Sequence, residues 1–223
     1  SAGAAITTGG SCIAIGSAAM AVHTTGGNNI AIGAGAMDNT DEGSTSLGST
    51  HNIFIGLDSG GGTWTNVATD QNVAIGNYTM DSTLAGAMRN TVIGYWSLSA
   101  MTSGGDNIAI GRNVGNTLTT TSNTVLIGND AGTAINATGA NGTVAIGQDA
   151  LTALTSGSGN IAVGYNAGSN ITTGTNNLAI GQDSMAGGGA VITGAGNLGI
   201  GYRSLYALQG GGASNVCIGF YSG

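Results

Sequence analysis

Asn29-Ile30-Ala31-Ile32-Gly33 is the stretch that decides the fold, because the chain repeats it with small changes along its whole length. It returns, for example, as Asn107-Ile108-Ala109-Ile110-Gly111. Alignment on the final residue gives twelve copies, whose anchor glycines are Gly16, Gly33, Gly56, Gly76, Gly94, Gly111, Gly128, Gly147, Gly164, Gly181, Gly201 and Gly219. The spacing between anchors runs from 17 to 23 residues. Such self-similarity predicts a solenoid, and we expect residues 1–223 to form a single repeat domain.

The residues before each anchor glycine have the composition of a short β-strand. The residue directly before the glycine is Ile in eleven copies and Val163 in the twelfth. The residue two places before that one is Ile, Val or Leu in every copy except the one with Thr91. Alternating β-branched residues predict a strand with one face in a core, and the glycine lets the chain turn out of it. We therefore predict an all-β fold, a parallel β-solenoid or β-roll, with these flanking aliphatic residues inside.

The middle residue of each strand is expected to face solvent, yet it is never polar. The twelve middle residues are Ala14, Ala31, Phe54, Ala74, Val92, Ala109, Leu126, Ala145, Ala162, Ala179, Gly199 and Cys217. A strand that is apolar on both faces is covered on both faces, and a solitary solenoid has nothing to cover the outer one. We therefore expect this row to be the interface of a homotrimer, since a threefold axis is the simplest symmetry that covers it.

Asparagine stands four places before the anchor glycine in nine copies. Stacked at the spacing of a parallel ladder, these side chains would form a row of amide hydrogen bonds along the coil. The alternative interpretation of the row is a glycan or ion site.

The repeat resembles known attachment proteins. The pattern Asn-Ile-Ala-Ile-Gly-x-x-Ala resembles the head repeats of trimeric autotransporter adhesins, and it is similar to the Asn-x-Ala-Ile-Gly-Tyr-x-Ala-Leu repeats of phage tail-fibre proteins. Residues 160–167 and 197–205 are the nearest matches. The adhesin repeat is shorter and steadier, so the 17-residue base with insertions is closer to the phage-fibre type. The resemblance covers essentially the whole chain.

The resemblance implies a trimer of parallel β-solenoid subunits that presents a surface for attachment. The expected function is therefore structural: a segment of a phage tail fibre or, as the alternative, of a bacterial trimeric autotransporter adhesin head. The expected location is extracellular, on a virion or on a bacterial cell surface. The expected partners are further copies of the chain, a host-surface glycan or protein receptor, and other fibre or virion segments, which would cover the open ladders at both ends.

Charge and hydropathy disfavour other partners. Ten acidic residues stand against three arginines, there is no lysine, and the net charge is −7. Binding to nucleic acid or to an anionic membrane surface requires clustered cations, which the chain lacks. No apolar run approaches the roughly 20 residues that cross a bilayer, so we expect no membrane insertion.

Aromatic residues are the candidates for receptor or glycan binding. Seven of the ten occupy the two positions after an anchor glycine: Tyr78, Tyr95, Trp96, Tyr165, Tyr202, Phe220 and Tyr221. These positions otherwise carry polar residues, so the rings are expected at the surface, where they suit carbohydrate stacking or a protein contact. The alternative is that they pack on the next turn.

Insertions lie at residues 38–51, 57–71, 133–142 and 186–196. Trp64, in the second insertion, is the strongest single candidate, and its alternative role is to cover the core.

No motif in the chain predicts catalysis. His23 and His51 are isolated, so we expect no metal and no cofactor. Asp130 and Asp149 occupy matching positions, but a solvated surface explains them better than an acid pair. Two rival functions fit the sequence less well. A hexapeptide-type acyltransferase needs three hexads per coil, whereas each unit here supplies one. An ice-binding solenoid needs Thr on nearly every coil, and Thr–Thr pairs such as 24–25 and 172–173 occur in only a few.

Overall fold

The fold is an all-β parallel β-solenoid, as the repeat predicted. The computed structural model describes residues 1–4, 6, 10–40, 48–65, 67–136 and 138–223. Within these residues it has one 3-10 helix, η1 (Thr138–Ala140), and twelve strands of three residues each. The strands are β1 (Ile13–Ile15), β2 (Ile30–Ile32), β3 (Ile53–Ile55), β4 (Val73–Ile75), β5 (Thr91–Ile93), β6 (Ile108–Ile110), β7 (Val125–Ile127), β8 (Val144–Ile146), β9 (Ile161–Val163), β10 (Leu178–Ile180), β11 (Leu198–Ile200) and β12 (Val216–Ile218).

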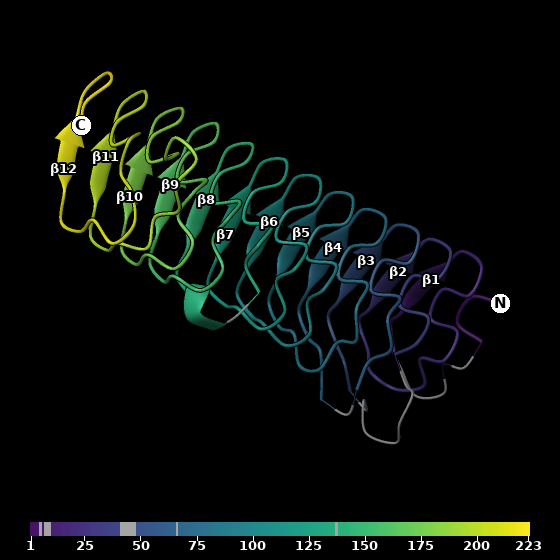
Figure 1. Cartoon of the computed structure of the whole chain (residues 1–223). Helices are drawn as coiled ribbons and strands as arrows, with labels where there is room; N and C mark the ends of the chain where they lie inside the picture. The colour runs from purple at the N-terminus through teal and green to yellow at the C-terminus, as the bar shows by residue number, and fades with distance from the viewer. Residues whose placement is uncertain (5, 7–9, 41–47, 66, 137) are drawn as a thin grey trace. The chain divides into compact units, whose positions relative to one another are not determined.

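The chain forms two compact units, Ser1–Ile110 with β1–β6 and Gly111–Gly223 with β7–β12. Inside each unit every strand pairs in parallel with the next strand along the chain. Figure 1 shows the strands of each unit stacked side by side, with the turns carried round from coil to coil. The register is one to one, so that Ala31 stands opposite Ala14 on one side and Phe54 on the other. Equivalent residues of the repeat therefore form straight rows.

The strand faces are the reverse of those predicted. The middle residue points into the coil, and no flanking residue of any strand is buried. Ten middle residues are buried inside a single chain: Ala31, Phe54, Ala74, Val92, Ala109, Leu126, Ala145, Ala162, Ala179 and Gly199. Ala14 in β1 and Cys217 in β12 are half-buried in the same row. The prediction that this row faces outward as a trimer interface is wrong.

The narrow interior of the coil explains the reversal. Residues three and four places after the anchor glycine also point inward, as fully buried Ala36 and Met37 do. Where the fourth residue is Met or Leu, the middle strand residue is usually Ala. Where the middle residue is large, the fourth is glycine: a Cβ on Gly132 would lie 3.1 Å from Leu126 Cδ2. If the strands were turned over, their two flanking rows, mostly isoleucine, would point into this space. They would overfill it, because protein interiors are close-packed.

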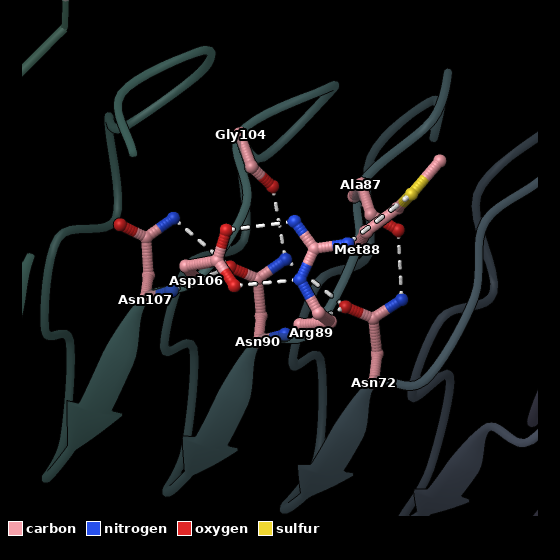
Figure 2. A network of polar contacts seen from close by, with 8 residues as sticks. All are labelled: Asn72, Ala87, Met88, Arg89, Asn90, Gly104, Asp106 and Asn107. Atoms are coloured by element: carbon pink, nitrogen blue, oxygen red, sulfur yellow. Dashed lines mark hydrogen bonds and ion pairs between the residues drawn. The ribbon is translucent and has the colours of Figure 1, made fainter. Parts of the chain in front are cut away.

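The asparagine row is a buried amide ladder. In the first unit each Nδ2 donates to Oδ1 of the asparagine one coil earlier, at 2.9 to 3.2 Å, from Asn52 to Asn107. The second unit repeats this arrangement from Asn177 to Asn215 at 2.8 to 3.1 Å. Figure 2 shows three members of the first ladder, one in each of three neighbouring coils. The prediction of an amide ladder is confirmed, and these side chains are not available to a ligand.

Candidate functional site

The outward side of the strands is an aliphatic surface. We call the first and third residues of the strands the outer aliphatic face; 23 of these 24 residues are Ile, Val or Leu, and the other is Thr91. Away from β1 and β12, Ile75, Ile93, Ile108 and Ile161 are still 37 to 39% exposed. Six strands about 4.8 Å apart and about 10 Å long give each unit roughly 300 Å² of this surface. A contiguous aliphatic surface of this extent is comparable to the largest apolar patch on a typical monomer, and such patches are often functional.

A second row runs along the turn that follows the strands. We call the two residues directly after each anchor glycine the corner row. The backbone N–H of the second residue donates to the carbonyl of the first residue one coil earlier, as Tyr78 does to Leu57 at 2.9 Å and Trp96 to Asn77 at 3.1 Å. These hydrogen bonds hold corner residues of successive coils in register. Side chains at the corner therefore form a ladder with the spacing of the strands.

The second corner residue has a left-handed backbone in every coil. Its φ lies between 48° and 66° throughout, and seven of the twelve residues are Gly, Asn or Asp, which tolerate this conformation. Four of the other five are Tyr78, Trp96, Arg203 and Tyr221. All four lie in two groups of aromatic side chains. The enrichment of this position in Gly, Asn and Asp is the signal in the repeat alignment from which the backbone requirement could have been predicted.

The first aromatic group contains three of the predicted binding residues. Tyr95 and Trp96 stack with ring centroids 5.5 Å apart and planes 29° from parallel. Tyr78, one coil earlier, meets Tyr95 edge-on at 5.8 Å and Trp96 at 6.5 Å. Tyr95 is 44% and Trp96 48% exposed, whereas Tyr78 is half-buried. We call this group the Trp96 cluster.

The second aromatic group contains three more, together with an arginine. Tyr202 stacks on Phe220 at 5.0 Å and meets Tyr221 edge-on at 5.3 Å. Arg203 lies over the rings of Tyr202, Tyr206 and Tyr221, at 5.0 to 5.6 Å from the ring centroids. Its guanidinium also donates to the Tyr221 hydroxyl at 3.0 Å and pairs with an acidic corner residue, Asp183. A side-chain hydrogen bond between Tyr202 and Tyr221 is the main cause of the raised pKa of Tyr202.

The remaining two candidates differ from these groups. Tyr165 is exposed at the corner and has no ring neighbour within the described residues. Trp64 is fully buried: its ring lies 5.6 Å from Phe54, and its Nε1 donates to the Gly60 carbonyl at 3.0 Å. The prediction that Trp64 contacts a ligand is therefore wrong, because the insertion folds back and uses the indole to cover the core. The 41–47 part of the first insertion lies outside the described residues.

Carboxylates from the second, third and fourth coils influence one another. Partial burial, with the nearby charges of Asp58 and Asp38, raises the pKa of Asp81 to about 6. Burial and the charge of Asp58 also raise the pKa of Asp38. By contrast, Asp130 pairs with Arg112 at 3.5 Å, so it does not stand as a free acid beside Asp149.

The histidines belong to the fold rather than to a metal site. Buried His23 shares a hydrogen bond with Thr40 Oγ1 at 2.9 Å and another with the Gly26 carbonyl at 3.1 Å. Exposed His51 lies 3.3 Å from Asn28 Nδ2. Across the described ranges, no three His, Cys, Asp or Glu side chains converge on a point where a metal ion would fit. In the same ranges no helix has the length and hydropathy of a membrane span.

Comparison with protein-family models, characterised proteins and solved structures found no match to this chain.

Proposed function

We propose that this chain is a segment of an extracellular, homotrimeric attachment fibre, without catalytic activity. The observation that supports the proposal best is the outer aliphatic face. Because the middle row is inside the coil, we expect the interface on the flanking rows instead. This outward side of the sheet is apolar and still lacks a cover, and a sheet that is apolar on both faces is normally covered on both. A second and third copy with the same coil spacing would match this face row for row. A threefold axis would let all three faces meet without an open edge.

The resemblance of the repeat to phage tail-fibre and adhesin-head repeats supports the same function. The 17-residue base with insertions favours the phage-fibre form, with an adhesin head as the alternative. The proposed partners are further fibre segments and a glycan or protein on a host surface. Three copies would present each corner residue three times, so that weak contacts add by avidity.

Hydroxyl contacts favour this proposal over an ice-binding solenoid. Oγ1 of Thr119 donates to the Asn136 carbonyl at 3.0 Å, and Oγ1 of Thr155 to the Thr172 carbonyl at 3.1 Å. These hydroxyls join one coil to the next. An ice-binding surface would need a regular array of threonines that present their hydroxyls to water.

Light scattering of the purified chain over a dilution series tests the assembly. We expect a species near three times 21.4 kDa. The double variant Ile108→Asn/Ile161→Asn places one polar group on the outer aliphatic face of each unit and should dissociate the trimer, while circular dichroism stays unchanged. Val191→Asn is the matched control, because Val191 is 56% exposed but lies in an insertion outside that face. A folded wild-type monomer at every concentration would overturn the proposal.

A further inference from the structure

We propose that the Trp96 cluster is a binding site for the ring of a neutral saccharide, an inference that rests on the proposed attachment function. Tyr95 and Trp96 stack within 29° of parallel, and about half of each side chain is exposed. Flat, exposed aromatic surface of this kind suits the apolar C–H face of a sugar ring. Within the described residues the cluster lies on an open surface and not in a cavity. Such a surface fits an extended chain of sugars better than a small compact ligand.

Polar groups stand at the edges of the cluster. Among the described residues, the hydroxyls of Tyr78 and Tyr95 and the Nε1 of Trp96 make no hydrogen bond. Asn77, next to Tyr78, accepts through Oδ1 from the Leu57 N–H at 3.0 Å, and its Nδ2 makes no hydrogen bond in the described ranges. Donors and acceptors around an apolar surface match the hydroxyls around a sugar ring.

The charge around the cluster favours a neutral saccharide over an acidic one. Arg89 is the only described cation of the first unit apart from the chain terminus; it precedes β5, whereas Tyr95 and Trp96 follow it. It is already paired with Asp106 at 2.7 Å. The corner residue one coil before Tyr78 is Asp58. Within the first unit, a uronate or sialate would meet this carboxylate without an unpaired arginine to balance it, although recognition of carboxylates relies on such cations. Arg112, the corner residue that follows Trp96 in the repeat, pairs with Asp130 at 3.5 Å.

Backbone conformation gives an independent reason to assign a function to these rings. Tyr78 and Trp96 both have φ of 58° at a position where the other coils mostly carry Gly, Asn or Asp. Bulky residues are unfavourable there, and Trp96 regains little by burial because it is half-exposed. Residues held in an unfavourable conformation without a packing benefit are concentrated at functional sites.

Titration of the full chain with neutral hexasaccharides of glucose, mannose and N-acetylglucosamine tests the site, with hexagalacturonate as the acidic probe. The chain has two tryptophans, and Trp64 is buried, so a change of fluorescence reports on Trp96. We expect at least one neutral hexasaccharide to quench or shift this fluorescence saturably and to bind by calorimetry. Trp96→Asn installs a residue suited to the left-handed backbone and should fold like the wild type, but we expect its affinity to fall about tenfold or more.

Trp96→Phe keeps a stacking ring and should retain affinity within a few-fold. Val191→Asn, which removes an exposed apolar side chain from an insertion outside the cluster, is the matched control and should bind as the wild type does. Absence of binding to all neutral probes, tighter binding of hexagalacturonate, or undiminished binding by Trp96→Asn would overturn the site. Shielding of Trp96 from acrylamide in the unliganded protein would overturn it too, because the rings would then lie between copies. A trimer that binds no saccharide refutes this site alone, whereas a monomer that binds through Trp96 refutes the assembly alone.

Discussion

Nδ2 of Asn90 donates to Oδ1 of Asn72 at 3.0 Å, and the Asn90 backbone N–H donates to the same oxygen at 3.0 Å. The amide of Asn90 also bonds the Gly104 carbonyl at 2.9 Å and accepts twice from Asn107 (Figure 2). Asn90 thus joins three successive coils from inside the protein. Buried amides that are fully bonded fix the register, because a shift would leave several of these groups without partners.

Asn90→Ala should destabilise the chain by about 2–4 kcal/mol, since it removes the acceptor of two hydrogen bonds from Asn107 and the donor to the Gly104 carbonyl. Urea denaturation measures the loss. Asn77→Ala is the matched control: it removes one exposed contact and should cost less than about 1 kcal/mol. Equal losses in the two variants would contradict the structural role of the ladder.

Thr143 occupies the asparagine position one coil before the ladder of the second unit begins at Asn160, and it can be used to extend that ladder. It is fully buried at the asparagine position, and its Oγ1 has no hydrogen-bond partner in the part of the chain that the structure describes. Thr143→Asn would supply an acceptor for the N–H groups of Asn160 and should raise stability by about 1 kcal/mol. Thr143→Val removes the unpaired hydroxyl and should be neutral or slightly stabilising. A lower melting temperature for both variants would show that the hydroxyl is bonded in solution.

The complementary volumes of Leu126 and Gly132 predict a compensating pair of substitutions. Leu126→Ala should cost about 2–5 kcal/mol, because it opens a cavity in the coil. Gly132→Leu alone should also destabilise, since its side chain would collide with Leu126. The double variant restores the combination of Ala145 and Leu151 found in the next coil, so it should recover at least half of the loss. If the stability losses of the two single variants simply added up in the double variant, the side chains at positions 126 and 132 would not occupy the same space.

The raised pKa of Asp81 predicts that stability falls between pH 4 and pH 6. The folded protein holds the proton more tightly than the unfolded chain, so the stabilising contribution is complete below about pH 4 and is lost as the pH rises through the folded pKa of about 6. The side chain is partly exposed, so we expect a change of about 1 kcal/mol rather than the full value of the shift. Melting temperature over pH 4–8 measures it.

Asp81→Asn should flatten this profile and raise stability at pH 7 relative to the wild type. Asp106→Asn provides a contrast, because the hydrogen bond from Arg89 lowers the pKa of that carboxyl. It should leave the fall between pH 4 and pH 6 in place. A wild-type profile that rises over this range would refute the assignment to Asp81.

The amino-acid sequence by itself determined the number of coils, the position of each strand and the register, because the anchor glycine and its preceding aliphatic residues recur in every unit. It also located the asparagine ladder and placed most of the aromatic candidates at exposed corners. These features depend on local backbone chemistry and on a period that can be counted.

Only the tertiary structure decided which side of each strand is inside. Both sides are apolar, so hydrophobicity could not distinguish them; the free volume of the coil does, and it depends on residues such as Met37 and Gly132 further along the turn. The sequence did hold one signal of which side is inside: where the middle strand residue is large, the fourth residue after the glycine is small, as in Leu126 and Gly132. The same limit applies to Trp64, whose burial depends on how its insertion folds back over Phe54. It applies to the Trp96 cluster as well, because residues of separate coils meet only when the chain has coiled.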